Sequence, residues 1–215
     1  AGVTRLSIGV QSFDDRLLRE MERYEKYGSS AEIQEHIRTA ASYFPTVNVD
    51  LIFNLPHQTL ELLRQDVEIF LSLGANQVSF YPLMTSPTVA GRMADTMGLP
   101  DRRRLRPFFN TILEQLRPEF TASSAWCFTR RGHGLDEYIV EADHYVGVGS
   151  GAFSYLEGTL YTTTFSLQTY GRRIAQGLTG ITTAHRLGVG DQMRYTLLMR
   201  MFGLRLDRAW AQQRH

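Results

Sequence analysis

The first half of the chain alternates short apolar runs with amphipathic segments. Ser29 and Ser30 stand before one amphipathic segment and Thr59 before the next, and these residue types favour the start of a helix. Gly74 follows the second segment, where glycine suits the end of a helix. The apolar runs have strand length and lie at 5–10, 47–53 and 77–83. Strands and helices that alternate at this spacing predict βαβ units and a parallel sheet.

The second half has a different texture. A helix is predicted at 101–116, and two helix-like stretches, 166–176 and 190–201, close the chain. Between them lie strand-like runs rich in aromatic residues and glycine, at 120–128, 144–156 and 158–165. We therefore predict an α/β region, a β-rich extension and a helical segment, with the bounds 1–118, 119–165 and 166–215.

Composition excludes several classes of protein. The chain has 215 residues, a net charge of +1 and 43% hydrophobic residues, which is typical of a soluble globular domain and argues against general nucleic-acid binding. It contains no run of 18 apolar residues, so no membrane span is expected. Its one cysteine, Cys127, cannot form an internal disulfide, which fits a reducing cytoplasm.

Polar residues fall where the parallel strands should end. Gln11, Asp50 and the segment 81–84 lie at or near these ends, and ligands bind at that rim of an α/β sheet. A carboxylate inside an apolar strand needs a partner, because burying an unpaired charge is costly. Arg23 could be the partner of Asp50 or an ordinary arginine on a helix surface. Gln11 could reach into the cleft or cap the next turn.

Three stretches together resemble a known family. They read "RLSIGVQSFDD", "NVDLIFNLPHQT" and "GVGSGAFSYLEG", and in this order they are similar to the radical S-adenosylmethionine enzymes of the oxygen-independent coproporphyrinogen oxidase type. The resemblance covers essentially the whole chain. It implies the C-terminal part of a partial (β/α)6 barrel, a β-rich extension on the substrate side and the start of a helical C-terminal module.

The resemblance also implies roles for single residues. Gln11 corresponds to a glutamine that hydrogen-bonds the methionine end of S-adenosylmethionine, and Arg23 to an arginine that pairs with its carboxylate. Asp50 corresponds to an aspartate that contacts the ribose hydroxyls. Asn54 departs from the family, which has glycine there, although asparagine tolerates a positive φ. Three apolar positions would pack around the adenosine: Ile52, Met84 and Phe153.

The family holds a [4Fe–4S] cluster through a CxxxCxxC loop, and an electron donor reduces that cluster. Cys127 alone cannot hold one. The resemblance begins at about the fourth strand of the barrel. We therefore expect this chain to be a fragment of a longer protein and inactive by itself, and a natural homologue without a cluster is the alternative.

The middle of the chain points to a subgroup. The H-N-x-x-Y-W signature of the family's heme chaperones is absent. The segments 79–87 and 124–165 resemble the heme-utilisation enzymes, which methylate heme with a carbon radical, open the porphyrin ring without oxygen and free the iron. Coproporphyrinogen decarboxylation, a heme chaperone without catalysis and a barrel that merely binds a nucleotide stay open as alternatives.

A porphyrin is flat, apolar and edged by carboxylates, so its site should offer aromatic rings with arginines at the rim. The substrate candidates are Trp126, Arg130, Arg131 and Tyr155. Plain β-sheet packing explains such aromatic residues equally well. His133 and His144 are possible iron ligands or proton donors, or structural histidines. The other aromatic residues of this stretch are Phe128, Tyr138, Tyr145, Phe153 and Tyr161.

Overall fold

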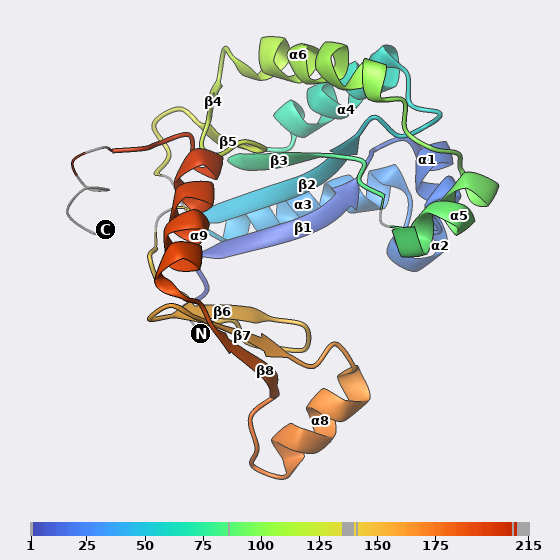
Figure 1. The fold of residues 1–215 in the computed structure, drawn as a ribbon. Coiled ribbons are helices and arrows are strands. Elements are labelled where there is room, and N and C mark those ends of the chain that lie inside the picture. The colour runs from blue at the N-terminus through green and yellow to red at the C-terminus, as the bar shows by residue number, and fades with distance from the viewer. Residues whose placement is uncertain (1, 86, 135–139, 141, 208, 210–215) are drawn as a thin grey trace. The chain divides into compact units, whose positions relative to one another are not determined.

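The structure is a computed structural model that describes residues 2–85, 87–134, 140, 142–207 and 209. The chain forms two compact units, Ala1–Asp136 and Glu137–His215, and each is described by itself. Figure 1 shows the strands and helices of both units. Within the described ranges, no helix combines the length and the apolar character that a membrane crossing requires.

The first unit contains a mixed five-stranded sheet. The strand order is β1-β2-β3-β5-β4, and β1, β2 and β3 run parallel. β5 is antiparallel to β3, and β4 is antiparallel to β5. The three predicted parallel strands are therefore confirmed, together with the α/β class. The bounds are β1 Arg5–Gln11, β2 Thr46–Phe53, β3 Gln77–Pro82, β4 Phe120–Ala122 and β5 Cys127–Arg130.

Two helices of this unit, α3 and α4, begin where the sequence predicts caps. Ser29 accepts a hydrogen bond from the backbone N–H of Glu32, whose side chain accepts from the N–H of Ser29 in return, a capping box at the start of α3. Thr59 caps α4 in the same way, by accepting from Leu62. Gly74, with φ +77°, follows the end of α4. The helices are α1 Asp15–Glu20, α2 Tyr24–Tyr27, α3 Ser30–Tyr43, α4 Leu60–Ser72, α5 Pro87–Thr96 and α6 Leu105–Leu116, with a 3-10 turn, η1, at Arg102–Arg104.

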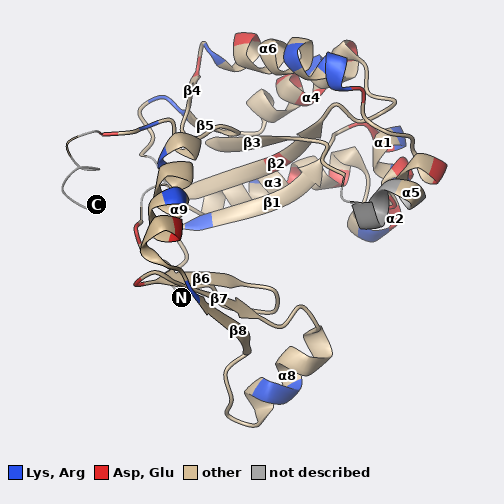
Figure 2. Cartoon of the chain, in the orientation of Figure 1, with Lys and Arg blue, Asp and Glu red and all other residues tan. Residues whose placement is uncertain are grey.

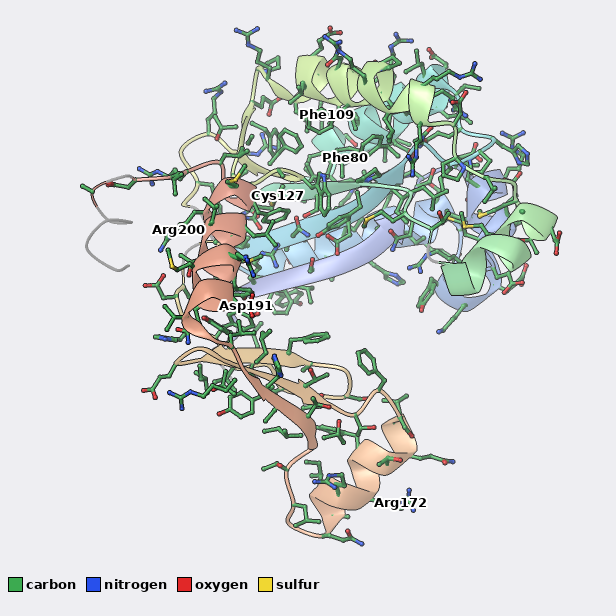
Figure 3. All side chains as sticks on the ribbon, in the orientation of Figure 1. Phe80, Phe109, Cys127, Arg172, Asp191 and Arg200 are labelled. Carbon is green, nitrogen blue, oxygen red and sulfur yellow. The ribbon has the colours of Figure 1, made fainter. Side chains whose placement is uncertain are left out.

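One face of the sheet is apolar and carries the core. Alternate residues of the strands point to this face and pack against α3, α4 and α6, as Figure 1 allows the reader to follow. Phe80 of β3 and Phe109 of α6 point into this layer (Figure 3). Complete burial of a large apolar side chain such as Phe70 contributes about 1.5–3 kcal/mol to stability. The core therefore fixes which face of each strand looks away from the helices.

The opposite face of the sheet is polar. Most residues that alternate with the core positions here are small or polar: Ser7, Gly9, Asn48, Asp50, Gln77, Ser79 and Thr129. Figure 2 shows few charged residues on β1, β2 and β3, and both signs of charge on α6. The polar groups of this face bond mostly to one another, as when Gln77 accepts from Arg5 and donates to Thr129. Asn48, Gln77 and Ser79 are buried, and buried polar groups of this kind need such hydrogen-bond partners.

The second unit holds an antiparallel three-stranded sheet in the order β6-β7-β8. Its elements are β6 Phe153–Leu156, β7 Thr159–Thr163, α8 Leu167–Ala175, β8 Ile181–Arg186 and α9 Val189–Phe202. The two helices lie within one residue of their predicted bounds. β8 went unpredicted because its residues are mostly polar and exposed, so no apolar alternation marks it.

The predicted region 119–165 does not form one body. β4 and β5 join the first sheet, whereas β6 and β7 belong to the second unit, and the division falls at Asp136. The reason is that aromatic and β-branched composition marks a segment as strand but does not say which strand it will pair with. The first sheet therefore extends beyond residue 118.

β1 lies at an edge of the five-stranded sheet, and its partner within the described residues is β2. The sequence predicts this open edge. Unpaired backbone groups on an edge strand template association with another chain. We expect purified residues 1–215 to self-associate as the concentration rises, which sedimentation velocity over a concentration series would measure. A monomer over the whole series would contradict this expectation.

Candidate functional site

β1 ends in an unusual backbone conformation at Gln11. Its φ is +78°, in the left-handed region that non-glycine residues seldom adopt, and the β1–β2 register shifts between Gly9 and Gln11. Such a conformation costs of order 1–3 kcal/mol and therefore persists only where the surroundings impose it. The bulge turns the side chain back over Gly9. A β-carbon on Gly9 would lie 2.9 Å from Nε2 of Gln11.

Arg23 reaches the same place from the start of α2. One of its guanidinium nitrogens donates a hydrogen bond to the carbonyl oxygen of Gly9. The guanidinium carbon lies 4.4 Å from the centroid of the Tyr27 ring, which supports the side chain from behind. A guanidinium carries five N–H donors, so this contact leaves others to which a ligand can bind. Gln11 and Arg23 therefore meet over Gly9.

Asp50 lies beside this pair, because it is the register partner of Gly9 on β2. Its carboxylate accepts from the Ser7 hydroxyl at 3.0 Å and from the Asn48 amide at 2.8 Å. Asn48 is itself held by a hydrogen bond from Ser79. These partners of Asp50 are neutral, and the guanidinium of Arg23 contacts the carbonyl of Gly9. Ser7 and Asn48 orient the Asp50 carboxylate, and Asp50 is partly exposed.

These three side chains share one face at the carboxyl ends of the parallel strands. The arrangement offers a guanidinium for a carboxylate, an amide that both donates and accepts, and a carboxylate that can accept from hydroxyl groups. Ile52 follows Asp50 on the same face, opposite Tyr81 of β3. A small molecule that has a carboxylate at one end and a pair of hydroxyl groups at the other would match this order of groups.

The loops near this rim agree with the sequence in part. Asn54 adopts φ +65°, so the turn accommodates asparagine in place of glycine, and its amide donates to the carbonyl of Asp101. Met84 lies in the loop after β3, where its neighbour Leu83 donates to the carbonyl of Phe53. Met84 is 63% exposed, which is compatible with a ligand contact and with an ordinary surface position.

Trp126 stands near the same rim, but the two predicted arginines do not. The Trp126 ring meets Tyr81 edge-on with centroids 5.5 Å apart. Arg130 forms an ion pair with Glu119, and its backbone N–H donates to Asn76, just before β3 begins. Arg130 therefore lies at the amino ends of the parallel strands, opposite Gln11.

Arg131 and His133 lie at that opposite end as well. Arg131 donates to the carbonyl of Arg117, and His133 bonds the hydroxyl of Thr46 at the start of β2. Arg130 and Arg131 lie at this end because β5 runs antiparallel and carries its last residues away from the end of β3. Cys127 is buried in β5.

Phe153 and Tyr155 belong to the second unit. Phe153 is half-exposed and packs edge-on against Phe165, with centroids 6.1 Å apart. Tyr155 is buried against Tyr195, with centroids 4.3 Å apart, and His144 stacks on its ring. Tyr155 therefore takes part in the packing of this unit. Tyr138 lies outside the described residues.

Asp66 is the residue that the sequence analysis missed. Only 2% of it is exposed, yet it is an acid on the apolar side of α4. Its carboxylate accepts from the Ser12 hydroxyl, from the backbone N–H of Phe13 at 2.6 Å and from the Gln58 amide at 3.3 Å. The signal was present, since Asp66 follows Leu63 by three residues on the stripe that the helix buries.

The electrostatics of Asp66 are dominated by its burial. Burial raises the pKa of the Asp66 carboxyl to about 7, against the opposing effect of the hydrogen bonds from Phe13, Ser12 and Gln58. The nearby Asp14 carboxylate raises it further. No group of three or more histidine, cysteine, aspartate or glutamate side chains among the described residues could hold a metal ion.

Comparison with known proteins gives relatives of two kinds. The heme chaperone HemW of Bacillus subtilis is 31% identical over 170 residues, which are 74% of this chain and 43% of that protein. The oxygen-independent coproporphyrinogen III oxidase of Paracoccus denitrificans is 30% identical over 154 residues, 70% of this chain and 30% of that protein. This chain thus spans less than half the length of these relatives. No protein-family model matches it.

A solved structure supports the fold. The coproporphyrinogen III oxidase HemN of Escherichia coli, described as a radical SAM enzyme, superposes with a TM-score of 0.79 at 20% identity. The match covers 99% of this chain and 53% of that one. At this identity the likeness concerns the fold, and it agrees with the α/β class and the parallel strands predicted from the sequence.

The buried carboxyl predicts a pH dependence of stability. The pKa of Asp66 in the folded protein, about 7, lies above its ordinary value of 3.8, so the folded state binds the proton more tightly. This contribution to the free energy of unfolding is fully present below about pH 4 and is lost as the pH rises to 7, by at most about 1.4 kcal/mol per pH unit. Urea unfolding at several pH values would measure it.

Asp66→Asn should remove that part of the pH dependence, because an amide does not titrate. Glu68→Gln, at an exposed position of the same helix, is the matched control and should leave the profile of the wild type unchanged. If the difference in unfolding free energy between wild type and Asp66→Asn were independent of pH, the folded and unfolded states would bind the Asp66 proton equally tightly, which would contradict the raised pKa.

Proposed function

We propose that the protein containing this chain is a radical S-adenosylmethionine enzyme that acts on heme or a related porphyrin. The observation that carries the proposal is the meeting of Gln11 and Arg23 over Gly9, with Asp50 beside them on the same face. The relatives, heme chaperones and coproporphyrinogen oxidases, support the porphyrin side of the proposal. S-adenosylmethionine bound to a reduced [4Fe–4S] cluster supplies a carbon radical in such enzymes.

The residues fit S-adenosylmethionine group by group. Arg23 takes the methionine carboxylate, since a guanidinium fork suits a carboxylate. Gln11 bonds the same end of the ligand through its amide. Asp50 accepts from the ribose hydroxyls, and Ser7 and Asn48 hold it in place for that task. The apolar residues of this unit that would contact the adenosine are Ile52 and Met84.

The residues do not fit the cluster. A [4Fe–4S] cluster of this type needs three cysteine thiolates, and the single cysteine, Cys127, is buried in β5. The cluster ligands would thus come from outside these 215 residues, and we expect the chain by itself to be inactive. An electron donor that reduces the cluster is a required partner.

Within this class we favour the reaction of the heme-utilisation enzymes, in which a methyl group is transferred to heme and the ring opens and releases iron. Two features of the sequence support this choice: the H-N-x-x-Y-W signature is absent, and 124–165 resembles that subgroup. The Tyr81 and Trp126 rings, which meet near the ligand rim, offer an apolar surface to a flat substrate.

Two alternatives have support from the relatives. Decarboxylation of coproporphyrinogen III is the activity named for one kind, and heme delivery without catalysis is the role named for the other. A barrel that only binds a nucleotide is a third. The four possibilities differ in what they do to a porphyrin, so a single set of incubations separates them.

The whole protein, incubated without oxygen with a reductant and S-adenosylmethionine, should convert heme to a methylated open-chain tetrapyrrole and release its iron. Mass spectrometry and an iron chelator would detect the two products. The parallel incubation with coproporphyrinogen III should give no decarboxylated product. Decarboxylation would establish the oxidase alternative. Heme that is bound but unchanged would establish the chaperone. If neither porphyrin is bound or converted, the nucleotide-binding barrel is the remaining alternative.

Arg23→Ala should weaken S-adenosylmethionine binding by about 1.5–3 kcal/mol, the range for a hydrogen bond to a charged group. Gly9→Ala should weaken it as well, since its β-carbon would displace the flexible Gln11 amide without disturbing the core. Heme binding should change little in both variants. Equilibrium dialysis with each ligand would measure these effects in the whole protein.

Arg19→Ala is the matched control. Arg19 lies four residues earlier and makes a comparable contact with the Tyr24 ring, 3.7 Å from the centroid, but does not reach Gly9. It should bind S-adenosylmethionine like the wild type. An Arg23→Ala protein that also binds like the wild type would remove the assignment of this site.

A further inference from the structure

The turn that directly follows Gln11 is held by contacts with the protein interior. Ser12 and Phe13 are buried there, although a turn at a sheet rim is normally exposed. Asp14 then caps α1 by accepting from the backbone N–H of Leu17. The strained φ of Gln11 therefore sits between a paired strand on one side and two buried residues on the other.

Asp66 is the group that holds these two residues. The backbone N–H of Phe13 donates to Oδ1 of Asp66, and the Ser12 hydroxyl lies 3.1 and 3.0 Å from its two oxygens. The Ser12 oxygen already accepts from the backbone N–H of Asp14. Its proton is therefore directed at the carboxylate. One buried side chain on α4 thus fixes two successive residues next to Gln11.

From this geometry we infer that Asp66 is a positioning residue for the ligand site, which acts through Ser12 and Phe13 to hold the Gln11 amide over Gly9. The inference rests on the proposed function. It adds a residue that does not touch the ligand and lies on the opposite side of the strand end.

A purely structural role would be served as well by a neutral side chain. A buried carboxylate is costly, and it is tolerated here because three donors converge on it. The charged and titratable groups that face it are Asp14, whose carboxylate repels it, and Arg104, which donates to the carbonyl of its neighbour Gln58. A charged acceptor binds the Ser12 and Phe13 donors more strongly than a neutral acceptor would, and this is the property that a strained turn requires.

Gln58 gives the cluster a second arrangement. Among the described residues its Oε1 accepts no hydrogen bond, although Gln58 is buried. If Asp66 is protonated or replaced by asparagine, rotation of the Gln58 amide brings this oxygen to the new donor. Asp66→Asn can therefore keep an acceptor for Ser12 and Phe13 and use the Gln58 oxygen as the partner of its own amide, and it separates the charge of Asp66 from its shape.

The test measures S-adenosylmethionine binding by the whole protein at pH 6 and pH 8. Asp66→Ala should weaken binding roughly tenfold at pH 8, about the effect of losing one hydrogen bond to a charged group. Asp66→Asn should lose less. The affinity ratio of wild type to Asp66→Asn should increase about threefold or more from pH 6 to pH 8, because burial raises the pKa of Asp66 to about 7 and the carboxylate is ionised at the higher pH.

Hydrogen exchange of the Phe13 amide is the second readout, and it should be faster in Asp66→Ala than in wild type. Ser12→Ala replaces Asp66→Ala if the latter does not fold, with about a threefold loss of affinity expected. Glu68→Gln, on the exposed side of α4, should match the wild type in both readouts.

The outcomes separate the two proposals. If wild type binds S-adenosylmethionine and Asp66→Ala or Ser12→Ala binds it equally well, the positioning role is wrong and the proposed function stands. If the ratio of wild type to Asp66→Asn does not depend on pH, the charge of Asp66 has no part in it, which also overturns the inference. If wild type does not bind S-adenosylmethionine, the proposed function fails and the inference fails with it.

Discussion

The candidate site depends on one constraint, the missing side chain at Gly9. Two groups that differ in chemistry use the space above this residue: an amide from the end of its own strand and a guanidinium from the start of α2, with a carboxylate on the neighbouring strand beside them. Any side chain at Gly9 would meet the amide first. The backbone carbonyl of Gly9 also accepts the hydrogen bond of the guanidinium. Gly9 thus contributes through its missing side chain and through its backbone oxygen.

The two faces of the five-stranded sheet have different roles: one packs in the core and the other carries the candidate site. The apolar face, packed against α3, α4 and α6, sets the direction of every side chain on the strands, and the polar face follows from it because successive residues alternate. Asp66 departs from this division, since it stands on the apolar side of α4 and yet bonds to the turn that completes the polar face. The ligand rim is therefore held from the core as well as from the strands.

The sequence predicted those parts of the molecule that depend on local pattern. The parallel strands, the caps at Ser29 and Thr59 and the groups at the strand ends were readable because alternation and capping are properties of neighbours in the chain. The partner of β5 was not readable, since pairing between distant strands leaves no local mark. For the same reason the sequence did not show that Arg130 lies at the amino ends of the parallel strands, although its contribution to a basic, aromatic stretch was evident from composition. The burial of Asp66 could have been inferred from its place on the apolar stripe of α4. Its partners Ser12 and Phe13 could not, because they lie more than fifty residues away in the sequence.

At position 11, a residue that adopts a positive φ with little strain has a side chain too short to reach Gly9. Asparagine and glycine adopt a positive φ with less strain than glutamine does. Glycine there would leave no side chain, and asparagine would place its amide one methylene short of Gly9. Glutamine combines the strained backbone with a side chain long enough to fold back along the strand it has just left. Replacements that relax the chain at this point would therefore be expected to make the protein more stable and less able to bind, so position 11 is one where stability and function are opposed within a single residue.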